Sequence, residues 1–159
     1  MYYTYYQSPF GEIALTATNE GLTSLQFVQS ALPVAIDTKA KENKAPFTQV
    51  CEQLDQYFAG ERKEFDLPLA QTGTPFQQTV WQALCTIKQG ETKSYAWLAK
   101  KINNEKAIRA VGTANGANRI ALIVPCHRVI GSNGKLTGYA GGLALKAKLL
   151  MHEGANFKV

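Results

Sequence analysis

The sequence has 159 residues, and its 17 Lys and Arg against 12 Asp and Glu give a formal net charge of +5. Apolar residues make up 45% of it, which is typical of a globular protein and argues against a disordered chain. No stretch reaches the roughly 18 apolar residues of a membrane span, and no secretory signal is visible, so we expect no membrane association. Three scattered cysteines and two histidines form neither a disulfide framework nor a metal motif. This pattern predicts a reducing location, the cytoplasm, and no metal.

The charge is divided unevenly along the chain. Residues 1–72 hold 5 Lys and Arg against 9 Asp and Glu, whereas residues 73–159 hold 12 against 3. Such a division suggests that the second part faces a polyanion. A solvated, lysine-rich face would explain the same charges, so charge alone leaves both interpretations open.

The first 72 residues predict a small α+β scaffold. Runs rich in Tyr, Ile, Leu, Val and Thr alternate with turn residues, and Asn19-Glu20-Gly21 predicts a hairpin turn. Apolar residues at helical spacing, ended by Gly60, predict one helix. The expected elements are strands over 2–7, 11–18, 22–28 and 64–67, a polar loop over 30–46 and a helix over 47–59. Nothing in this part suggests chemistry.

The second part, after a boundary at Gln71-Thr72-Gly73, predicts helices. Thr74, Pro75 and Gln77 have the pattern of an N-cap, first turn and capping box, and Gly90 ends this helix. A second helix begins at Ser94, and a turn at Asn103-Asn104 leads to a third over 105–114. Two helices joined by a tight turn in a basic region are typical of a helix-turn-helix.

The remaining residues predict a buried run, a wing and a last helix. The apolar run 120–124 stops at Pro125, and the turn Ser132-Asn133-Gly134 separates 129–130 from 135–136. Leucines at helical spacing predict a helix over 142–152. The expected fold class is therefore α/β: a strand-rich α+β N-terminal domain, 1–72, then a mostly helical C-terminal domain, 73–159, with a winged helix-turn-helix-like DNA-binding unit.

The segment Pro125-Cys126-His127-Arg128-Val129 carries the strongest chemical signal. A lone cysteine after an apolar run is usually an inert core residue. Here histidine and arginine follow directly, and cationic neighbours lower a thiol's pKa, which favours a nucleophile. A cysteine beside a histidine also suits a thiol hydrolase, and these five residues do not decide between the two.

Longer blocks resemble the active-site region of the 6-O-methylguanine-DNA methyltransferases. The resemblance covers most of residues 73–155, in the family's order and spacing. It rests on Pro125-Cys126-His127-Arg128-Val129, Thr137-Gly138-Tyr139-Ala140-Gly141-Gly142, Gly90-Glu91-Thr92-Lys93-Ser94-Tyr95, Arg109-Ala110-Val111-Gly112 and Asn118. It implies DNA repair by direct reversal, in which an alkyl group passes irreversibly from the 6-oxygen of guanine, possibly also the 4-oxygen of thymine, to the protein.

The resemblance also implies catalytic roles. Cys126 would accept the alkyl group, because a thiolate is the soft nucleophile that attack on a saturated carbon requires. His127 would draw the thiol proton through a water, and Glu153 would orient His127. Asn118 would brace this network from a turn, and Tyr95 would donate to the guanine as its oxygen leaves.

DNA contacts and a base pocket follow from the same resemblance. The base would be flipped out of the stack and Arg109 would fill the gap, with the third helix in the minor groove. The expected DNA-binding residues are Arg109, Ala110, Gly112, Thr113, Asn115 and Arg128. The expected base pocket consists of Tyr95, Val124, Pro125, Tyr139 and Ala140; some relatives have serine in place of Ala140.

The expected partner is therefore double-stranded DNA carrying alkylated guanine, bound by a monomer. No cofactor is expected, and each molecule would act once, because no second nucleophile is available to remove the thioether. The alternatives are a non-catalytic alkyl-base-binding protein, which would lack Cys126, a cysteine hydrolase, and a helix-turn-helix regulator, which would normally be dimeric.

Overall fold

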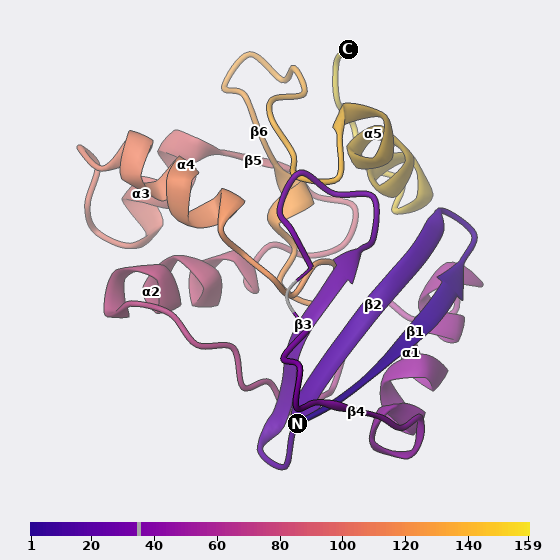
Figure 1. Ribbon diagram of the computed structural model, residues 1–159. Helices are drawn as coiled ribbons and strands as arrows, with labels where there is room; N and C mark the ends of the chain where they lie inside the picture. Colours follow the sequence, from indigo (N-terminus) through magenta and orange to yellow (C-terminus); the bar gives the residue numbers. More distant parts are fainter. Residues whose placement is uncertain (35) are drawn as a thin grey trace.

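The computed structural model describes residues 1–34 and 36–159. A four-stranded sheet dominates the first part of the chain (Figure 1), with the order β3-β2-β1-β4. Its three long strands are antiparallel and the short β4 pairs with β1 in parallel. The strands are β1 (Tyr2–Ser8), β2 (Gly11–Thr18), β3 (Gly21–Phe27) and β4 (Lys41–Glu42). The three strands expected first in the sequence are confirmed.

One helix packs against this sheet. After the 3₁₀ turn η1 (Ala45–Phe47), α1 (Thr48–Phe58) buries Val50, Leu54 and Tyr57 among side chains of the strands. The expected helix over 47–59 is confirmed, and its buried positions follow the helical spacing that predicted it.

The second part of the chain forms the expected helix-turn-helix. Helix α2 (Pro75–Leu84) begins with the complete capping box of Thr74 and Gln77. Helix α3 (Tyr95–Lys101) is capped by Ser94 and leads into α4 (Ile108–Gly116), which packs on both α2 and α3. The remaining elements are β5 (Lys93–Ser94), which pairs in parallel with β6 (Val129–Ile130), the 3₁₀ turn η2 (Cys126–Arg128), and α5 (Leu143–His152).

Several details differ from the sequence-based expectations. Residues 64–67 form no strand, because the side-chain amide of Gln53 bonds both the N–H and the carbonyl of Asp66, as a neighbouring strand would. The wing is one hydrogen-bonded turn from Gly131 to Lys135, since Val129–Ile130 pairs with β5 instead. The expected loop over 30–46 holds β4 and η1, and its Ala35 lies outside the described residues.

Strand β3 joins the two parts of the molecule. Its Leu25 N–H donates to the carbonyl of Arg119 at 2.8 Å, and its carbonyl accepts from Ala121 N–H at 2.9 Å. Figure 1 shows helices α2, α3 and α4 gathered on this side of the sheet. Buried side chains from both parts form one continuous core, so the segment that leads to Cys126 is built directly onto the sheet. Across the described ranges, we find no helix with the length and apolar character that a membrane crossing requires.

Candidate active site

Cys126 lies at the end of a series of tight backbone turns. The N–H groups of Ile123, Val124 and Cys126 donate to Ala121, Ile120 and Val124, at 2.8, 3.1 and 2.8 Å respectively. Leu122 adopts a left-handed conformation with φ of 69°, which a leucine rarely takes. The chain is therefore held in a strained turn where it delivers the cysteine, a feature that clusters at functional sites.

Asn118 holds this turn together. Its amide nitrogen donates to the carbonyl of Val124 at 2.8 Å and to that of Ile120 at 3.2 Å, and its oxygen accepts from Ile120 N–H at 3.1 Å. Gln71, from the segment between the two parts, donates to the same oxygen at 3.0 Å. Asn118 is buried and braces the approach to Cys126 from several directions.

The thiol of Cys126 is buried in a polarised environment, with only 6% of the residue exposed. On balance the pKa of the thiol is raised, because burial outweighs the side chain of Asn118, the ammonium of Lys146 and nearby backbone amides, all of which lower it. The lowered pKa expected from the neighbouring His127 and Arg128 is therefore not found, and the thiol needs a base to ionise. Groups that favour the thiolate therefore surround a sulfur that water scarcely reaches. An unreactive core cysteine normally has apolar neighbours, so these polar and charged groups favour a reactive role for Cys126.

His127, Arg128 and Glu153 form a buried charged cluster beside the thiol. His127 Nε2 lies 2.8 Å from Glu153 Oε2, and Arg128 Nε donates to Glu153 Oε1 at 2.9 Å. Burial lowers the pKa of His127, which keeps the imidazole neutral near pH 7 and able to accept a proton. Burial alone would raise the pKa of Glu153, but His127 and Arg128 outweigh it and hold that pKa at about 2. Glu153 is thus a fixed negative charge facing the imidazole.

Two buried residues join this site that the sequence analysis did not predict. The hydroxyl of Tyr57, on α1, donates to Glu153 Oε2 at 2.6 Å. The ammonium of Lys146, on α5, donates to the carbonyls of Val129 at 2.6 Å and Thr137 at 3.0 Å, and burial lowers its pKa to about 8. Each lies on a predicted amphipathic helix, where core packing explains an aromatic residue and contact with solvent explains a lysine. No local pattern therefore marked either residue as part of the site.

Of the five expected base-pocket residues, only Tyr139 and Ala140 line the same cavity as Cys126. Cys126, Asn118, Tyr139 and Ala140 line one cavity of about 30 Å³, walled on its far side by β3 and residues 30–32. Val124 and Pro125 are buried in and beside the turn that precedes the cysteine. Tyr95 is half-buried at the start of α3, where its phenol accepts a hydrogen bond from Thr137 at 3.0 Å.

Comparison with known proteins identifies the family. One family model, described as the DNA-binding domain of 6-O-methylguanine DNA methyltransferase, matches residues 75–155. A second, the ribonuclease-like domain of the same enzyme, matches residues 1–71. The chain belongs to the 6-O-methylguanine DNA methyltransferase family.

Relatives of similar length support this assignment. The methylated-DNA–protein-cysteine methyltransferase of Methanosarcina acetivorans is 51% identical over 98% of this chain and 99% of its own. The constitutive methylated-DNA–protein-cysteine methyltransferase of Bacillus subtilis is 46% identical over 99% of this chain and 98% of its own. The Mycobacterium tuberculosis OGT, solved in complex with DNA, superimposes with a TM-score of 0.91 at 46% identity and covers 97% of this chain and 93% of that one.

The exposed side chains of α4 are Ile108, 45% exposed, at its start, one arginine and two small residues. Arg109, Ala110 and Thr113 are exposed, and Gly112 is half-buried next to the ring of Tyr95. The helix can therefore approach a partner surface closely.

Two expected DNA-binding residues of this family member are instead internal. Arg128 is 6% exposed, and its guanidinium forms an ion pair with Glu153 and donates to the carbonyl of Ile87 at 2.7 Å. Asn115 is 5% exposed and its amide donates to the carbonyl of Cys126 at 3.4 Å. Both expectations are corrected, because each side chain supports the segment that carries the cysteine and neither reaches the surface.

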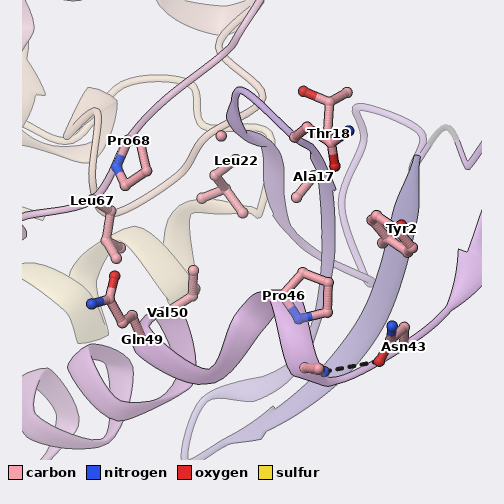
Figure 2. Close-up of a pocket in the computed structure, with 13 residues that line it drawn as sticks. Tyr2, Ala17, Thr18, Leu22, Asn43, Pro46, Gln49, Val50, Leu67 and Pro68 are labelled. Atoms are coloured by element: carbon pink, nitrogen blue, oxygen red, sulfur yellow. Dashed lines mark hydrogen bonds between the residues drawn. The ribbon is translucent and has the colours of Figure 1, made fainter.

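A larger cavity of this methyltransferase-family protein, about 410 Å³, lies apart from Cys126 (Figure 2). It opens between the β2–β3 turn and α1, with walls of mixed polarity that include Leu22, Val50 and Gln49. Its Asn43 side chain accepts a hydrogen bond from the backbone of Ala45 at 3.0 Å. The chemistry of the molecule is therefore concentrated around Cys126 and not in this more open space.

Proposed function

We propose that this protein repairs alkylated DNA by transferring a methyl or larger alkyl group from the 6-oxygen of guanine to its own Cys126. The observation that carries the proposal is the buried thiol set among Asn118, Lys146 and the His127–Glu153 pair, within a chain that shares this family's two domains. In this assignment residues 73–159 bind DNA and accept the alkyl group, and residues 1–72 support them.

His127 acts as the base that activates the thiol. Its Nε2 is engaged by Glu153, so the proton must be taken by Nδ1, a buried atom with no protein partner among the described residues. A bridging water between Nδ1 and Cys126 completes the path. The carboxylate stabilises the imidazolium that forms, as in other Cys-His and Ser-His sites.

The transfer is a single displacement at the alkyl carbon. The sulfur of Cys126 forms a bond to that carbon while the bond from the carbon to guanine O6 breaks, and the electron pair stays with the guanine. Tyr95, whose hydroxyl hydrogen is free to turn toward the base because its oxygen accepts from Thr137, donates to the departing purine. The thiol proton passes to His127 and from there to solvent, and the guanine that leaves takes up one proton from solvent, so the step balances.

The product is a thioether, which is not a leaving group under these conditions. The described residues that line the Cys126 cavity include no second thiol, amine or imidazole; their polar groups are the amides of Asn118 and Gln26 and the hydroxyls of Ser30 and Tyr139, which are far weaker nucleophiles. Each molecule therefore acts once.

DNA binding is assigned to the exposed face of α4. Small side chains at Ala110 and Thr113 let the helix enter the minor groove, and Arg109 takes the place of the flipped base. Lysine and arginine contacts to phosphate supply most of the affinity, so binding weakens as salt rises. The lesion itself provides the specificity, and one protein molecule suffices for each lesion.

The pocket must open to receive a purine. Its 30 Å³ is about the volume that one water occupies in the liquid. The backbone of Ala31 donates to the carbonyl of Ala140 at 2.7 Å, which closes the cavity from the sheet side. Entry of the base therefore requires the 138–142 loop to move away from residues 30–32, at a cost that the flipped base repays on binding.

Intact mass spectrometry tests the proposal. After the protein is mixed with duplex DNA that carries 6-O-methylguanine, we expect its mass to rise by one methyl group, with peptide mapping placing the addition on Cys126. Cys126→Ala should abolish the gain but retain DNA binding. Cys85→Ser removes an exposed thiol and is the matched control, which should react as the wild type does. Sustained turnover, or methylation elsewhere, would contradict the proposal.

A further inference from the structure

One side chain from the first part of the chain enters the catalytic hydrogen-bond network. Tyr57 lies on α1, is 0% exposed, and donates its hydroxyl proton to Glu153 Oε2 at 2.6 Å. The two residues are 96 positions apart in the sequence. The supporting domain therefore contacts the catalytic carboxylate directly.

The phenol of Tyr57 is held in place from several sides. Its ring packs against Phe58, Phe65 and His152, with centroid separations of 5.0, 5.5 and 5.0 Å. Its backbone carbonyl also lies 2.8 Å from His152 Nε2, in the residue just before Glu153. The direction of the hydroxyl is thus fixed relative to the end of α5, as a precisely aimed hydrogen bond requires.

Tyr57 and His127 share one carboxylate oxygen. Glu153 Oε2 lies 2.8 Å from His127 Nε2 and accepts from Tyr57 at 2.6 Å and from Arg128 Nη2 at 3.2 Å, while Oε1 accepts from Arg128 Nε at 2.9 Å. Each donor withdraws negative charge from the oxygen, so a second donor weakens the attraction that the first one feels. Tyr57 therefore influences how strongly Glu153 holds the proton on His127.

We propose that Tyr57 is a positioning residue for the alkyl transfer, which orients the Glu153 carboxylate and moderates its pull on the His127 proton through the oxygen that they share. This inference rests on the proposed function. The neutral imidazole is the form that accepts the thiol proton, so the rate should fall at low pH as His127 becomes protonated. If the Glu153 carboxylate attracts the His127 proton less strongly, the pKa of His127 falls and the imidazole stays neutral to lower pH.

Other titratable groups also face this network. Arg128 and Lys146 oppose protonation of His127 from η2 and α5, and Tyr139 faces both Glu153 and Cys126 from the loop before α5. All of them stay unchanged when only the Tyr57 hydroxyl is altered. A shift in the pH profile on changing that hydroxyl therefore reports Tyr57 alone.

The test compares two changes of opposite effect on the full-length protein. Tyr57→Phe removes the donor, so Glu153 attracts the proton more strongly and the acid limb of the rate profile should move up by about half a pH unit. Replacing Tyr57 with 3,5-difluorotyrosine makes the phenol a stronger donor in nearly the same shape, so the acid limb should move down. The single-turnover methyl-transfer rate is measured from pH 5 to pH 9 by the mass gain on Cys126.

Tyr6→Phe is the matched control. It deletes another tyrosine hydroxyl that donates to a carboxylate of α1, that of Asp55. Neither Tyr6 nor Asp55 lines the Cys126 cavity, so the pH profile of this variant should match the wild type. If both Tyr57 variants retain the wild-type limb, or shift it in the same direction, the inference is wrong although the transfer itself stands. If the wild type fails to gain the methyl group, the proposed function has failed instead. If Tyr57→Phe does not fold, the difluorotyrosine protein decides alone.

Discussion

Replacing Glu153 with glutamine should destabilise the protein by an amount that depends on pH. The pKa of Glu153 is about 2, against 4.5 for an unperturbed carboxyl, and this difference corresponds to about 3 kcal/mol in favour of the folded, ionised state. Loss of one partner from a buried ion pair typically costs about 3–5 kcal/mol, because the other charge is left uncompensated. Here that charge belongs to Arg128, with a side chain 7% exposed. Both estimates predict that Glu153→Gln lowers the free energy of unfolding at pH 7 by about 3 kcal/mol.

The pH dependence follows from the direction of the shift. A carboxyl with a lowered folded pKa contributes its full stability above about pH 4.5, and this contribution is lost as the pH falls toward 2. The difference in unfolding free energy between wild type and Glu153→Gln should therefore be largest at neutral pH and shrink through this range. Urea denaturation followed by tryptophan fluorescence at several pH values measures it.

Glu20→Gln provides the control for a surface carboxylate, because Glu20 is exposed in the β2–β3 turn. It should change stability by less than about 0.5 kcal/mol at any pH. A loss below 1 kcal/mol for Glu153→Gln, or a difference that is the same at pH 7 and pH 3, would refute the claim that Glu153 is a buried, ionised partner.

Three further changes probe the reaction. Arg109→Ala should slow methyl transfer from duplex DNA at least tenfold more than transfer from a free 6-O-benzylguanine base, since only the duplex needs flipping; an equal loss on both substrates would exclude that role. Lys146→Met removes the cation that favours the thiolate, so the rate at pH 7 should fall about tenfold and recover partly at higher pH, whereas an unshifted pH profile would contradict this. Ala140→Ser narrows the cavity beside Cys126 and should slow benzyl transfer more than methyl transfer, measured as the ratio of the two rates; an unchanged ratio would remove the idea.

Local patterns predicted much of the fold. The capping box of Thr74 and Gln77 and the apolar spacing of α1 depend on neighbouring residues, and both were confirmed. The strand expected over 64–67 failed because Gln53, distant in sequence, satisfies the backbone there. Hydrogen bonds supplied by a remote side chain leave no local pattern, so this difference could not be read from the segment itself.

The site was predictable where a motif concentrated its residues. Cys126 and His127 are adjacent, so their chemistry was visible in one short segment. Arg128 was expected at the DNA surface from the family resemblance, and no local pattern revealed its partner Glu153, which comes 25 residues later. Tyr57 and Lys146 were missed for a related reason: an aromatic or a lysine in an amphipathic helix has ordinary explanations, and only the folded chain brings them to the charged cluster.

Strand β3 is an edge strand of the four-stranded sheet, and the way its free edge is covered affects the tendency of the protein to aggregate. The unpaired N–H and C=O groups of an edge strand are a template on which other chains can add and aggregate. Here the backbone of Arg119 and Ala121, a few residues before Cys126, forms hydrogen bonds with this edge of β3. The same hydrogen bonds thus guard against aggregation and set the position of the nucleophile. Any mutation that loosens them should cost solubility and repair together.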